Sequence, residues 1–434
     1  MQAFALSVYR LLTWALQPLI HLRLARRAAK EPLYGQWIEE RFGEYAQPRS
    51  SGWVWIHAVS LGETRAAAIL LRELRAQLPG MKLLLTHGTA TGREEGLKLL
   101  QTGDLQVWQP WDSKEAAQRF IAHFKPRIGI VMETEVWPNL CAAAQSAGVP
   151  MVLANARLNA RSLRKALRLS ALSRPAYASF HRVLAQTQDD ADRLLLAGAK
   201  DVLVMGNLKF DISLDLSLQS TGQKFKQNSP PLVLMLASSR EGEEAQFLEA
   251  IRGFAGLQTA QSATELVANK MSVPIQYMIV PRHPQRFSEV QQLCEQAGLR
   301  VSRRSQWQDR TEPADIWLGD SLGEMAMYYS LADVALLGGS FEPLGGQNLI
   351  EAIAAGCPVI MGPHTYNFQE ASDTAEMAGA AVRVPDMASG LLKAAELLAD
   401  TSQRQTLQLA GAKWLSASQG AATQQANAVA QLLH

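Results

Sequence analysis

Hydrophobic and polar positions follow a repeating order along most of this chain, in which a short apolar run precedes an amphipathic stretch. The apolar runs are mostly continuous, which is typical of parallel strands covered by helices on both faces. Amphipathic stretches, such as residues 64–77 and 113–124, predict helices between the strands. Two series of predicted strands result: residues 53–59, 82–87, 106–109, 128–133, 151–155, 182–186 and 202–206, and then residues 232–238, 275–280, 316–319, 334–338, 358–361 and 381–384.

Repeated strand–helix units predict a doubly wound parallel sheet for each series, and so an α/β fold of two Rossmann-like domains that face a cleft. Residues 213–230 are rich in Ser, Gln and Lys, run into Pro230-Pro231 and predict a linker. A chain of 434 residues with 47% hydrophobic content can bury two cores. The predicted segments are an N-terminal helix (1–30), a first domain (31–212), the linker (213–230), a second domain (231–410) and a C-terminal helix (411–434).

The first thirty residues differ from the rest because they contain arginine and lysine but no acid until Glu31. Polar residues recur there every three or four positions and predict one stripe of a helix, made of Ser7, Arg10, Thr13, Gln17 and His21. Arg10 and Pro18 interrupt what would otherwise be the roughly 20 apolar residues of a membrane span. We therefore expect an amphipathic helix in a membrane interface, with its basic tail on anionic headgroups. A single-pass anchor and a helix docked on the protein's own core are the alternatives, and either membrane interpretation leaves the rest of the chain on the cytoplasmic side.

Charge and cysteine content exclude some classes of function. The net charge of +2 provides no bulk field for nucleic acid. Cys141, Cys294 and Cys357 lie far apart without metal-ligand spacing, which indicates reduced thiols in a cytosolic compartment. Asp190-Ala191-Asp192 resembles a metal motif but lies in a helical pattern rather than at a strand end, and we predict no metal site.

A glycine-rich turn follows the predicted strand 334–338 and opens a helix at Gly345-Gly346-Gln347-Asn348-Leu349-Ile350-Glu351. Glycines let the backbone approach a phosphate, and the first turn of a helix favours negative charge. Glu351 is placed to reach a ribose hydroxyl. The pattern predicts a nucleotide site in the second domain, although an ordinary strand–loop–helix has the same spacing.

Acidic residues follow two predicted strands of the first domain. Glu63 stands at the start of a helix, where a carboxylate stays ionised and can act as a base or simply cap the helix. Glu133 and Glu135 would repel each other unless the backbone turns between them, in which case one serves the cleft and the other caps the next helix. The alternative is a pair of solvated loop acids.

Basic residues occupy other predicted strand ends. Lys209 is placed to offset leaving-group charge, or to form a surface ion pair with Asp211. Arg282 has a fork suited to phosphate. A basic stripe at helical spacing could meet an anionic acceptor or face solvent, and consists of Arg157, Arg161, Arg164, Lys165 and Arg168.

Taken as a set, these motifs resemble the Kdo transferases of Gram-negative bacteria (3-deoxy-D-manno-octulosonic acid transferases, glycosyltransferase family 30). The resemblance covers nearly the whole chain, because the N-terminal helix is followed in order by HAVSLGE, METEVWPN, NARLNARS, GNLKFD, PRHPQRF, GDSLGEM, GGSF, GGQNLIE and GPHTYNF. It implies a GT-B fold that transfers Kdo from CMP-Kdo to the lipid A precursor (lipid IVA) in lipopolysaccharide biosynthesis. It also implies inversion at the anomeric centre, no metal or further cofactor, and work on the anionic cytoplasmic face of the inner membrane.

The resemblance assigns roles to positions of this sequence. Glu63 matches the general base, and Glu133 and Lys209 match groups that stabilise the transition state. We further expect acceptor contacts from Ser60, Gly62, Arg157 and Arg161. The segments that match CMP-binding residues are Pro281, Arg282, Leu322, Gly323, Glu324, Asn348, Leu349, Ile350 and Glu351.

One departure and two competing functions qualify the resemblance. Family members often have His-Asn-Pro-Leu-Glu where this chain has Gln347 to Glu351, so a proton-donating role at position 347 is in doubt. A nucleotide-sugar 2-epimerase shares the two-domain fold but does not need the N-terminal helix or the basic stripe. A non-catalytic membrane scaffold would not need Glu63, Glu133 and Lys209 at strand ends.

Overall fold

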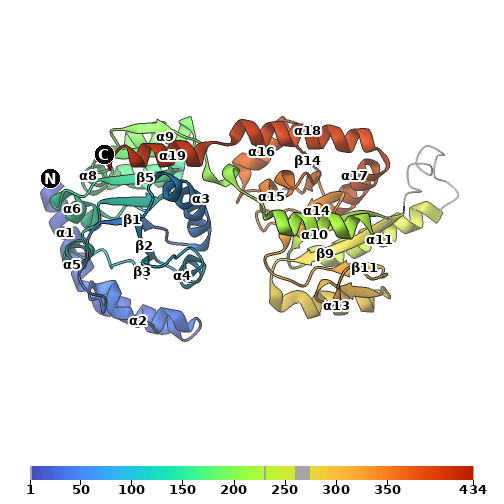
Figure 1. Ribbon diagram of the computed structural model, residues 1–434, viewed down its shortest axis with the longest axis horizontal. Coiled ribbons are helices and arrows are strands. Elements are labelled where there is room, and N and C mark those ends of the chain that lie inside the picture. The colour runs from blue at the N-terminus through green and yellow to red at the C-terminus, as the bar shows by residue number, and fades with distance from the viewer. Residues whose placement is uncertain (1, 229–230, 260–273, 434) are drawn as a thin grey trace. The chain divides into compact units, whose positions relative to one another are not determined.

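The computed structural model describes residues 2–228, 231–259 and 274–433, which form two compact units (Figure 1). The first unit comprises Met1–Asp211 and Ser418–His434, and the second comprises Ile212–Ala417. Each unit contains a seven-stranded sheet whose strands all pair in parallel. The predicted α/β class with two Rossmann-like sheets is confirmed.

The sheet of the first unit reverses its winding direction beside its first strand. Its strands lie in the order β3 (Leu105–Trp108), β2 (Lys82–His87), β1 (Trp53–His57), β4 (Ile128–Met132), β5 (Met151–Ala156), β6 (Arg182–Ala185) and β7 (Val202–Val204). The loops that leave β1 and β4 therefore diverge at a topological switch point, where open sheets of this kind bind ligands.

Alternation along β1 shows how this sheet is buried on both faces. Trp53 and Trp55 point to the side covered by α5, α6, α8 and α9, whereas Val54 and Ile56 point to the side covered by α3 and α19. The helices of the first unit are α1 (Gln2–Ala15), α2 (Gln17–Ala28), α3 (Leu61–Gln77), α4 (Ala90–Leu97), α5 (Lys114–Phe124), α6 (Pro138–Ser146), α7 (Ala160–Arg168), α8 (Ser170–Ala178), α9 (Gln188–Ala197) and α19 (Ala421–Ala430), with 3-10 turns η1 (Pro32–Gly35), η2 (Ile38–Phe42) and η3 (Leu208–Asp211).

The C-terminal residues belong to two different helices rather than to the single helix predicted for 411–434. Helix α18 (Thr401–Ser418) packs within the second unit, and the chain then bends at Gly420, whose φ is 102°. Helix α19 packs against α3 in the first unit (Figure 1). Its N-terminus is held by Asp211, whose carboxylate accepts hydrogen bonds from the N–H groups of Gly420 and Ala422, both at 2.6 Å.

The sheet of the second unit has the same type of winding. Its order is β10 (Val301–Arg303), β11 (Ile316–Leu318), β9 (Ile275–Pro281), β8 (Leu232–Ser239), β12 (Val334–Leu337), β13 (Val359–Met361) and β14 (Ala381–Arg383), so its switch point lies between β8 and β12. The remaining helices are α10 (Leu216–Gln227), α11 (Glu243–Thr259), α13 (Phe287–Gln296), α14 (Met325–Leu331), α15 (Leu349–Ala354), α16 (Gln369–Met377) and α17 (Met387–Ala399), with η4 (Pro284–Arg286) and η5 (Arg304–Gln306).

Helix α10 occupies most of the segment 213–230 that we predicted to be a linker. Phe225 is buried at its core-facing side, and the helix packs against α14. Gly222 makes this approach possible, because a Cβ atom there would lie 2.3 Å from the carbonyl oxygen of Met327. The polar residues of the segment form the solvent-exposed face of this helix, and its single phenylalanine, Phe225, packs into the core.

The N-terminal segment forms two helices instead of one, and Arg10 and Thr13 of its predicted polar stripe contact the protein, whereas Ser7 is exposed. The Arg10 guanidinium donates to Asn139 at 3.1 Å, Thr13 is buried, and Trp111 donates its indole N–H to the carbonyl of Thr13. Large apolar side chains are exposed on the other side of the two helices, among them Phe4, Leu11, Leu12, Trp14, Leu19 and Leu22. None of the helices in the described parts of the chain has the length and hydropathy that a bilayer crossing requires.

Candidate active site

Glu63 is held at the end of β1 by the first turn of α3. Ser60 caps this helix, and its hydroxyl donates to one oxygen of the Glu63 carboxylate at 3.0 Å. The backbone N–H of Val59 donates to the other oxygen at 2.9 Å. This arrangement is a variant of the capping box, so Glu63 does cap the helix, as one of our two interpretations predicted. Each carboxylate oxygen still has a lone pair for another donor.

The environment of Glu63 also gives it the properties of a base. The pKa of its carboxyl is raised to about 7, chiefly by burial and also by the negative charges of Glu133 and Glu135, while the hydrogen bond from Val59 acts in the opposite direction. The most effective general base has a pKa close to the working pH. Capping and proton transfer are therefore compatible at this position.

Glu133 follows β4 on the other side of the switch point and has a left-handed backbone with φ 56°. The predicted turn between Glu133 and Glu135 is thus present. Its buried carboxylate forms an ion pair with the Nε atom of Arg157 at 2.8 Å, and Arg157 is about half exposed. Arg157 lies before α7 and not in it, so it is not part of the predicted helical stripe.

Glu135 does not cap α6, contrary to our prediction. Asp112 has this role, because its carboxylate accepts from the backbone N–H groups of Asn139 and Leu140 at 3.1 and 2.8 Å. Tyr9 of α1 donates to the same carboxylate at 2.9 Å. Burial raises the pKa of Asp112 to about 6 despite these bonds. The sequence contained no signal for this residue, because Asp112 and Asn139 meet only in the tertiary structure.

Lys209 lies in the short turn η3 after β7, within a polar network that sequence reasoning missed. Asn155 accepts the N–H of Leu208 on its side-chain oxygen at 3.0 Å, and its own N–H donates to Gln425 of α19 at 2.9 Å. Gln425 is fully buried and also donates to the carbonyl of Gly206 at 3.1 Å. The loop that carries Lys209 is thus fixed by a helix more than 200 residues further along the chain.

The other predicted acceptor contacts lie on exposed parts of the first unit. Ser60 and Gly62 are in the cap and first turn of α3, and Gly62 is exposed. Arg161 lies on α7, where the stripe predicted for this region is exposed to solvent at Arg161, Arg164, Lys165 and Arg168. Leu163 and Ala166 of the same helix pack against the core.

The glycine-rich loop of the second unit follows β12, as predicted, and is shaped by tight backbone turns. Gly345 has φ 91°, and a Cβ atom there would lie 2.3 Å from the side chain of Asn367. Glu243, which leaves the neighbouring strand β8, holds the start of this loop. Its fully buried carboxylate accepts from the N–H groups of Gly339 at 2.7 Å and Phe341 at 3.1 Å. Glu243 was not among the site residues predicted from the sequence.

Asn348 and Glu351 meet at the end of this loop. Asn348 caps α15 through Ile350, and its amide donates to the Glu351 carboxylate at 3.2 Å. The side chains of Leu349 and Ile350 are buried, so of these two predicted nucleotide contacts only the backbone could touch a ligand. Helix α15 has only six residues and therefore offers little dipole of its own.

The remaining predicted donor contacts leave β9 and β11. Pro281 ends β9, and the backbone N–H of Arg282 donates to the carbonyl of Ser239 on the neighbouring strand at 3.0 Å. Glu324 forms an ion pair with Arg304 at 2.9 Å and accepts from the hydroxyl of Ser321. Leu322 is exposed, and Gly323 has φ 81°. The groups predicted for the donor therefore come from the carboxyl ends of several strands of one sheet.

Asp190 has a structural role in the first unit. Its carboxylate accepts from the N–H of Leu158 at 2.8 Å and from the hydroxyl of Thr187, the cap of α9. Within the described residues, no three side chains of His, Cys, Asp or Glu cluster as metal ligands would. All three cysteines are buried free thiols.

The comparison with solved structures agrees with this architecture. A crystal structure of Anabaena Alr3699/HepE in complex with UDP-glucose superposes with a TM-score of 0.53, over 88% of this chain and 99% of that chain, at 13% identity. That likeness concerns the fold alone. Two Rossmann-like units, each with polar residues at the strand ends of its switch point, define a fold of the GT-B type.

The sequence comparisons define the family. The sequence model of the family described as 3-deoxy-D-manno-octulosonic-acid transferase matches residues 36–212. The 3-deoxy-D-manno-octulosonic acid transferase of Bordetella pertussis is 47% identical over 427 residues, which are 96% of each chain. The protein of that name from Haemophilus influenzae is 32% identical over 93% of each chain. The chain belongs to the 3-deoxy-D-manno-octulosonic acid (Kdo) transferase family of lipopolysaccharide biosynthesis.

Proposed function

We propose that this enzyme transfers Kdo from CMP-Kdo to the lipid A precursor lipid IVA, with inversion at the anomeric carbon and with Glu63 as the general base. The observation that carries the proposal is the state of Glu63, a half-buried carboxyl at the switch point of the first unit whose pKa is raised to about 7 by burial. At neutral pH part of such a carboxyl is ionised and can accept a proton. Its pKa is also high enough for the proton to stay bound after the transfer.

Proton transfer to Glu63 accompanies the formation of the new glycosidic bond. The acceptor hydroxyl attacks the anomeric carbon of Kdo and passes its proton to the carboxylate of Glu63, while the bond from this carbon to the phosphate of CMP breaks. A base on the face opposite the leaving group gives inversion. Glu133, which forms an ion pair with Arg157, adds negative potential that raises the proton affinity of Glu63.

The transition state has two anionic groups that need compensation, the Kdo carboxylate and the departing phosphate. Lys209 in the first unit and Arg282 in the second are the proposed cations. Asn348 and Glu351, which hold each other at 3.2 Å, are proposed to bind the nucleoside part of CMP. In this proposal the compensation comes from side chains and backbone N–H groups, and the reaction uses no metal or further cofactor.

The outer faces of α1, α2 and α7 support work at an anionic membrane surface. Because Arg10 and Thr13 of α1 contact the protein, apolar residues of this helix are left exposed, with Phe4 74% and Leu11 64% accessible. The exposed arginines and lysine of α7 provide positive charge in the same unit. We propose that these helices lie in the interface of the cytoplasmic leaflet.

A product analysis tests the proposed function. The purified chain is incubated with CMP-Kdo and a tetra-acylated, bisphosphorylated glucosamine disaccharide, and the lipid is analysed by mass spectrometry. We expect the mass of one or more Kdo residues to be added, with equimolar release of CMP, and NMR of the product to show inverted anomeric configuration. An acceptor of unchanged mass with the active Bordetella enzyme as positive control would refute the proposal.

A further inference from the structure

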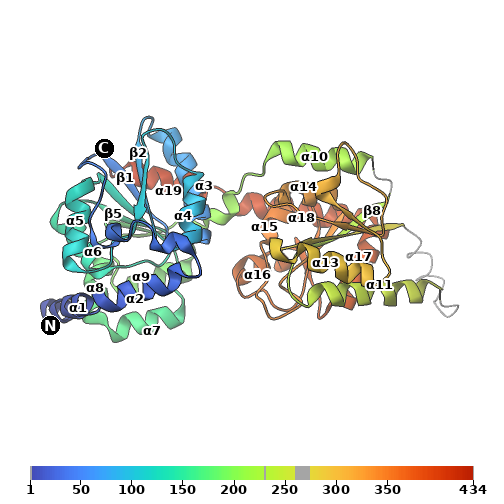
Figure 2. The same ribbon diagram turned by 90° about the horizontal axis from the view of Figure 1, so that it is seen from below.

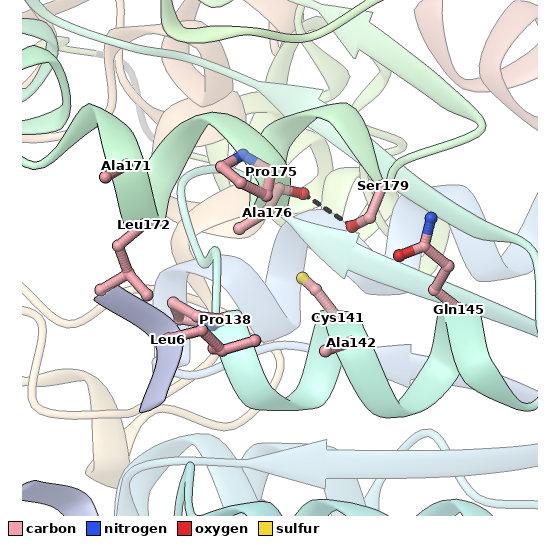
Figure 3. Close-up of a pocket in the computed structure, with 10 residues that line it drawn as sticks. All are labelled: Leu6, Pro138, Cys141, Ala142, Gln145, Ala171, Leu172, Pro175, Ala176 and Ser179. Carbon is pink, nitrogen blue, oxygen red and sulfur yellow. Dashed lines mark hydrogen bonds between the residues drawn. The ribbon is translucent and has the colours of Figure 1, made fainter. Parts of the chain in front are cut away.

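An apolar pocket lies between α1, α6 and α8 of the first unit (Figure 3). Leu6 of α1, Ala142 of α6 and Leu172 of α8 each form part of its wall, and its volume is about 150 Å³. Figure 3 shows Leu172, Leu6 and Pro138 at one end and Ser179 and Gln145 at the other. The pocket is thus a slot that follows the direction of α6.

The chemistry of the slot suits hydrocarbon. The Ser179 hydroxyl donates to the carbonyl of Ala176 at 2.7 Å, so it does not require a polar ligand. Cys141 in the wall is buried, and burial raises the pKa of its thiol to about 12, so the sulfur is uncharged. Seven of the ten lining residues are Leu, Ala or Pro, and none of the ten has a charged side chain. Pro138 and Gln145 are about 10 Å apart along the helix axis, which is a length for several methylene groups.

One end of the slot lies at the edge of the sheet that carries the catalytic acids. Helix α6 begins at Pro138, directly after the turn that contains Glu133 and Glu135. Glu135 is close enough to Glu63 to influence its charge state. A ligand with a chain in the slot therefore has its polar end near the carboxyl ends of β1 and β4.

The surroundings of the slot are cationic and apolar. Helix α7, which packs against α8, exposes Arg161, Arg164, Lys165 and Arg168, and the corner between the two helices exposes Leu169. Figure 2 shows α1, α8 and α7 side by side on this part of the first unit, in agreement with the contacts of α8 to both. An apolar slot with a basic border is complementary to a lipid that has an anionic head.

We infer that the slot between α1, α6 and α8 binds a segment of one acyl chain of the phosphorylated lipid acceptor. The identity of the acceptor rests on the proposed function, whereas the slot, its lining and its charged border do not. We assign the slot to the acceptor and not to a bulk membrane lipid because its Pro138 end follows the turn of Glu133 and Glu135. In the proposed function this is the region where the acceptor hydroxyl binds.

Filling the slot tests this inference. Ala142→Phe places a ring in the slot, and Ala147→Phe places the same ring on the exposed end of α6, outside the lining, as the matched control. The dissociation constant is measured by titration calorimetry in detergent for the tetra-acylated bisphosphorylated disaccharide and for its fully deacylated form. Each methylene displaced from an apolar site weakens binding roughly 4-fold, so the loss of two or three predicts an about 15- to 60-fold weaker complex for Ala142→Phe.

The expected pattern is specific to the acyl chain. Ala142→Phe weakens binding of the acylated acceptor only, Ala147→Phe weakens neither ligand, and Ala171→Phe, which fills the slot from α8, repeats the effect of Ala142→Phe. An unchanged melting temperature and an unchanged KM for CMP-Kdo show that the fold is intact. Because binding is measured without turnover, a chain that binds as expected but transfers no Kdo would refute the proposed function and leave this inference standing.

Three results would overturn the inference. The first is equal affinity of the Ala142→Phe and Ala147→Phe variants for the acylated acceptor. The second is an equal loss of affinity for the acylated and the deacylated forms. The third is weaker binding of Ala142→Phe to phosphatidylglycerol vesicles with unchanged affinity for the acceptor, which would assign the slot to a membrane lipid.

Discussion

Glu63→Gln separates the helix-capping role of this residue from its proposed role as general base. The substitution keeps the shape of the side chain but removes the group that accepts a proton. We expect kcat to fall by about 10² to 10⁴, which is the usual contribution of a general base. Binding of CMP should be unchanged, because the groups proposed for the nucleotide belong to the other unit.

The same substitution should stabilise the first unit at alkaline pH. Because burial raises the pKa of Glu63 from 4.5 to about 7, its ionisation costs the folded state about 3 kcal/mol at pH values above 7. Glutamine carries no such charge, but it replaces one of the two carboxylate oxygens that accept from Val59 and Ser60, which costs about 1 kcal/mol. The net gain is about 1 to 2 kcal/mol, or a melting temperature higher by about 2 to 8 °C for a unit of this size.

The difference in stability between the wild type and Glu63→Gln depends on pH, because it follows the ionisation of Glu63. Below pH 4.5 Glu63 is protonated in both the folded and the unfolded chain, and the stabilising effect of glutamine should disappear. Between pH 4.5 and 7 the unfolded chain releases its proton first, so the stability of the wild type falls relative to that of the variant. Circular dichroism melts at pH 4.5 and 8.5 measure this difference.

The activity of the wild type should show the same ionisation. We expect kcat/KM, measured by CMP release, to fall about tenfold per pH unit below about 7 and to be constant above it. Glu135→Gln is the matched control, because it retains the base but removes a neighbouring negative charge. The pKa of Glu63 should then fall, and the decrease in kcat/KM should begin at a lower pH. Full transfer by Glu63→Gln, or a rate that is independent of pH between 5 and 7, would refute the reasoning.

Three further substitutions test the parts of the structure that hold the site. Gln425→Ala removes the two hydrogen bonds that fix the loop of Lys209, and should lower the free energy of unfolding by about 2 to 3 kcal/mol in urea melts. It should also lower kcat, with a smaller change in the KM for CMP-Kdo. Lys209→Met removes a cation from the transition state and should lower kcat about 10²-fold with little change in stability, measured by the same CMP-release assay. Glu243→Ala leaves the buried N–H groups of Gly339 and Phe341 without their acceptor and should weaken CMP binding at least 10-fold by calorimetry, whereas wild-type affinity would show that Glu243 does not shape this loop.

Much of the fold could be predicted because its signals are local. The runs at Trp53–His57 and Val334–Leu337 are buried on both faces and are apolar for that reason, so continuous hydrophobicity identified them as parallel strands. The edge strand Val301–Arg303 was missed because it has three residues, two of them polar. Helix α10 was missed because the segment is rich in polar residues and Phe225 is the one large side chain that the helix buries.

The candidate site was predictable only as far as it follows from strand ends. Glu63, Glu133 and Lys209 each come directly after a strand or its following turn, and parallel strands bring such positions to one edge of a sheet. The partners that orient these residues were not predictable. Arg157 directly follows β5, the strand beside that of Glu133, and Gln425 reaches the loop of Lys209 from the other end of the chain.

The amino-acid sequence by itself therefore determined the two parallel sheets, the positions of the acids and bases at their edges, and the family. The tertiary structure alone decided the side of α1 that faces the protein, the cap that Asp112 provides for α6, and the proton affinity of Glu63. Periodicity and turn chemistry act between neighbouring residues and can be read along the chain. Desolvation and long-range hydrogen bonds depend on which distant segments exclude water together, and they exist only after the chain has folded.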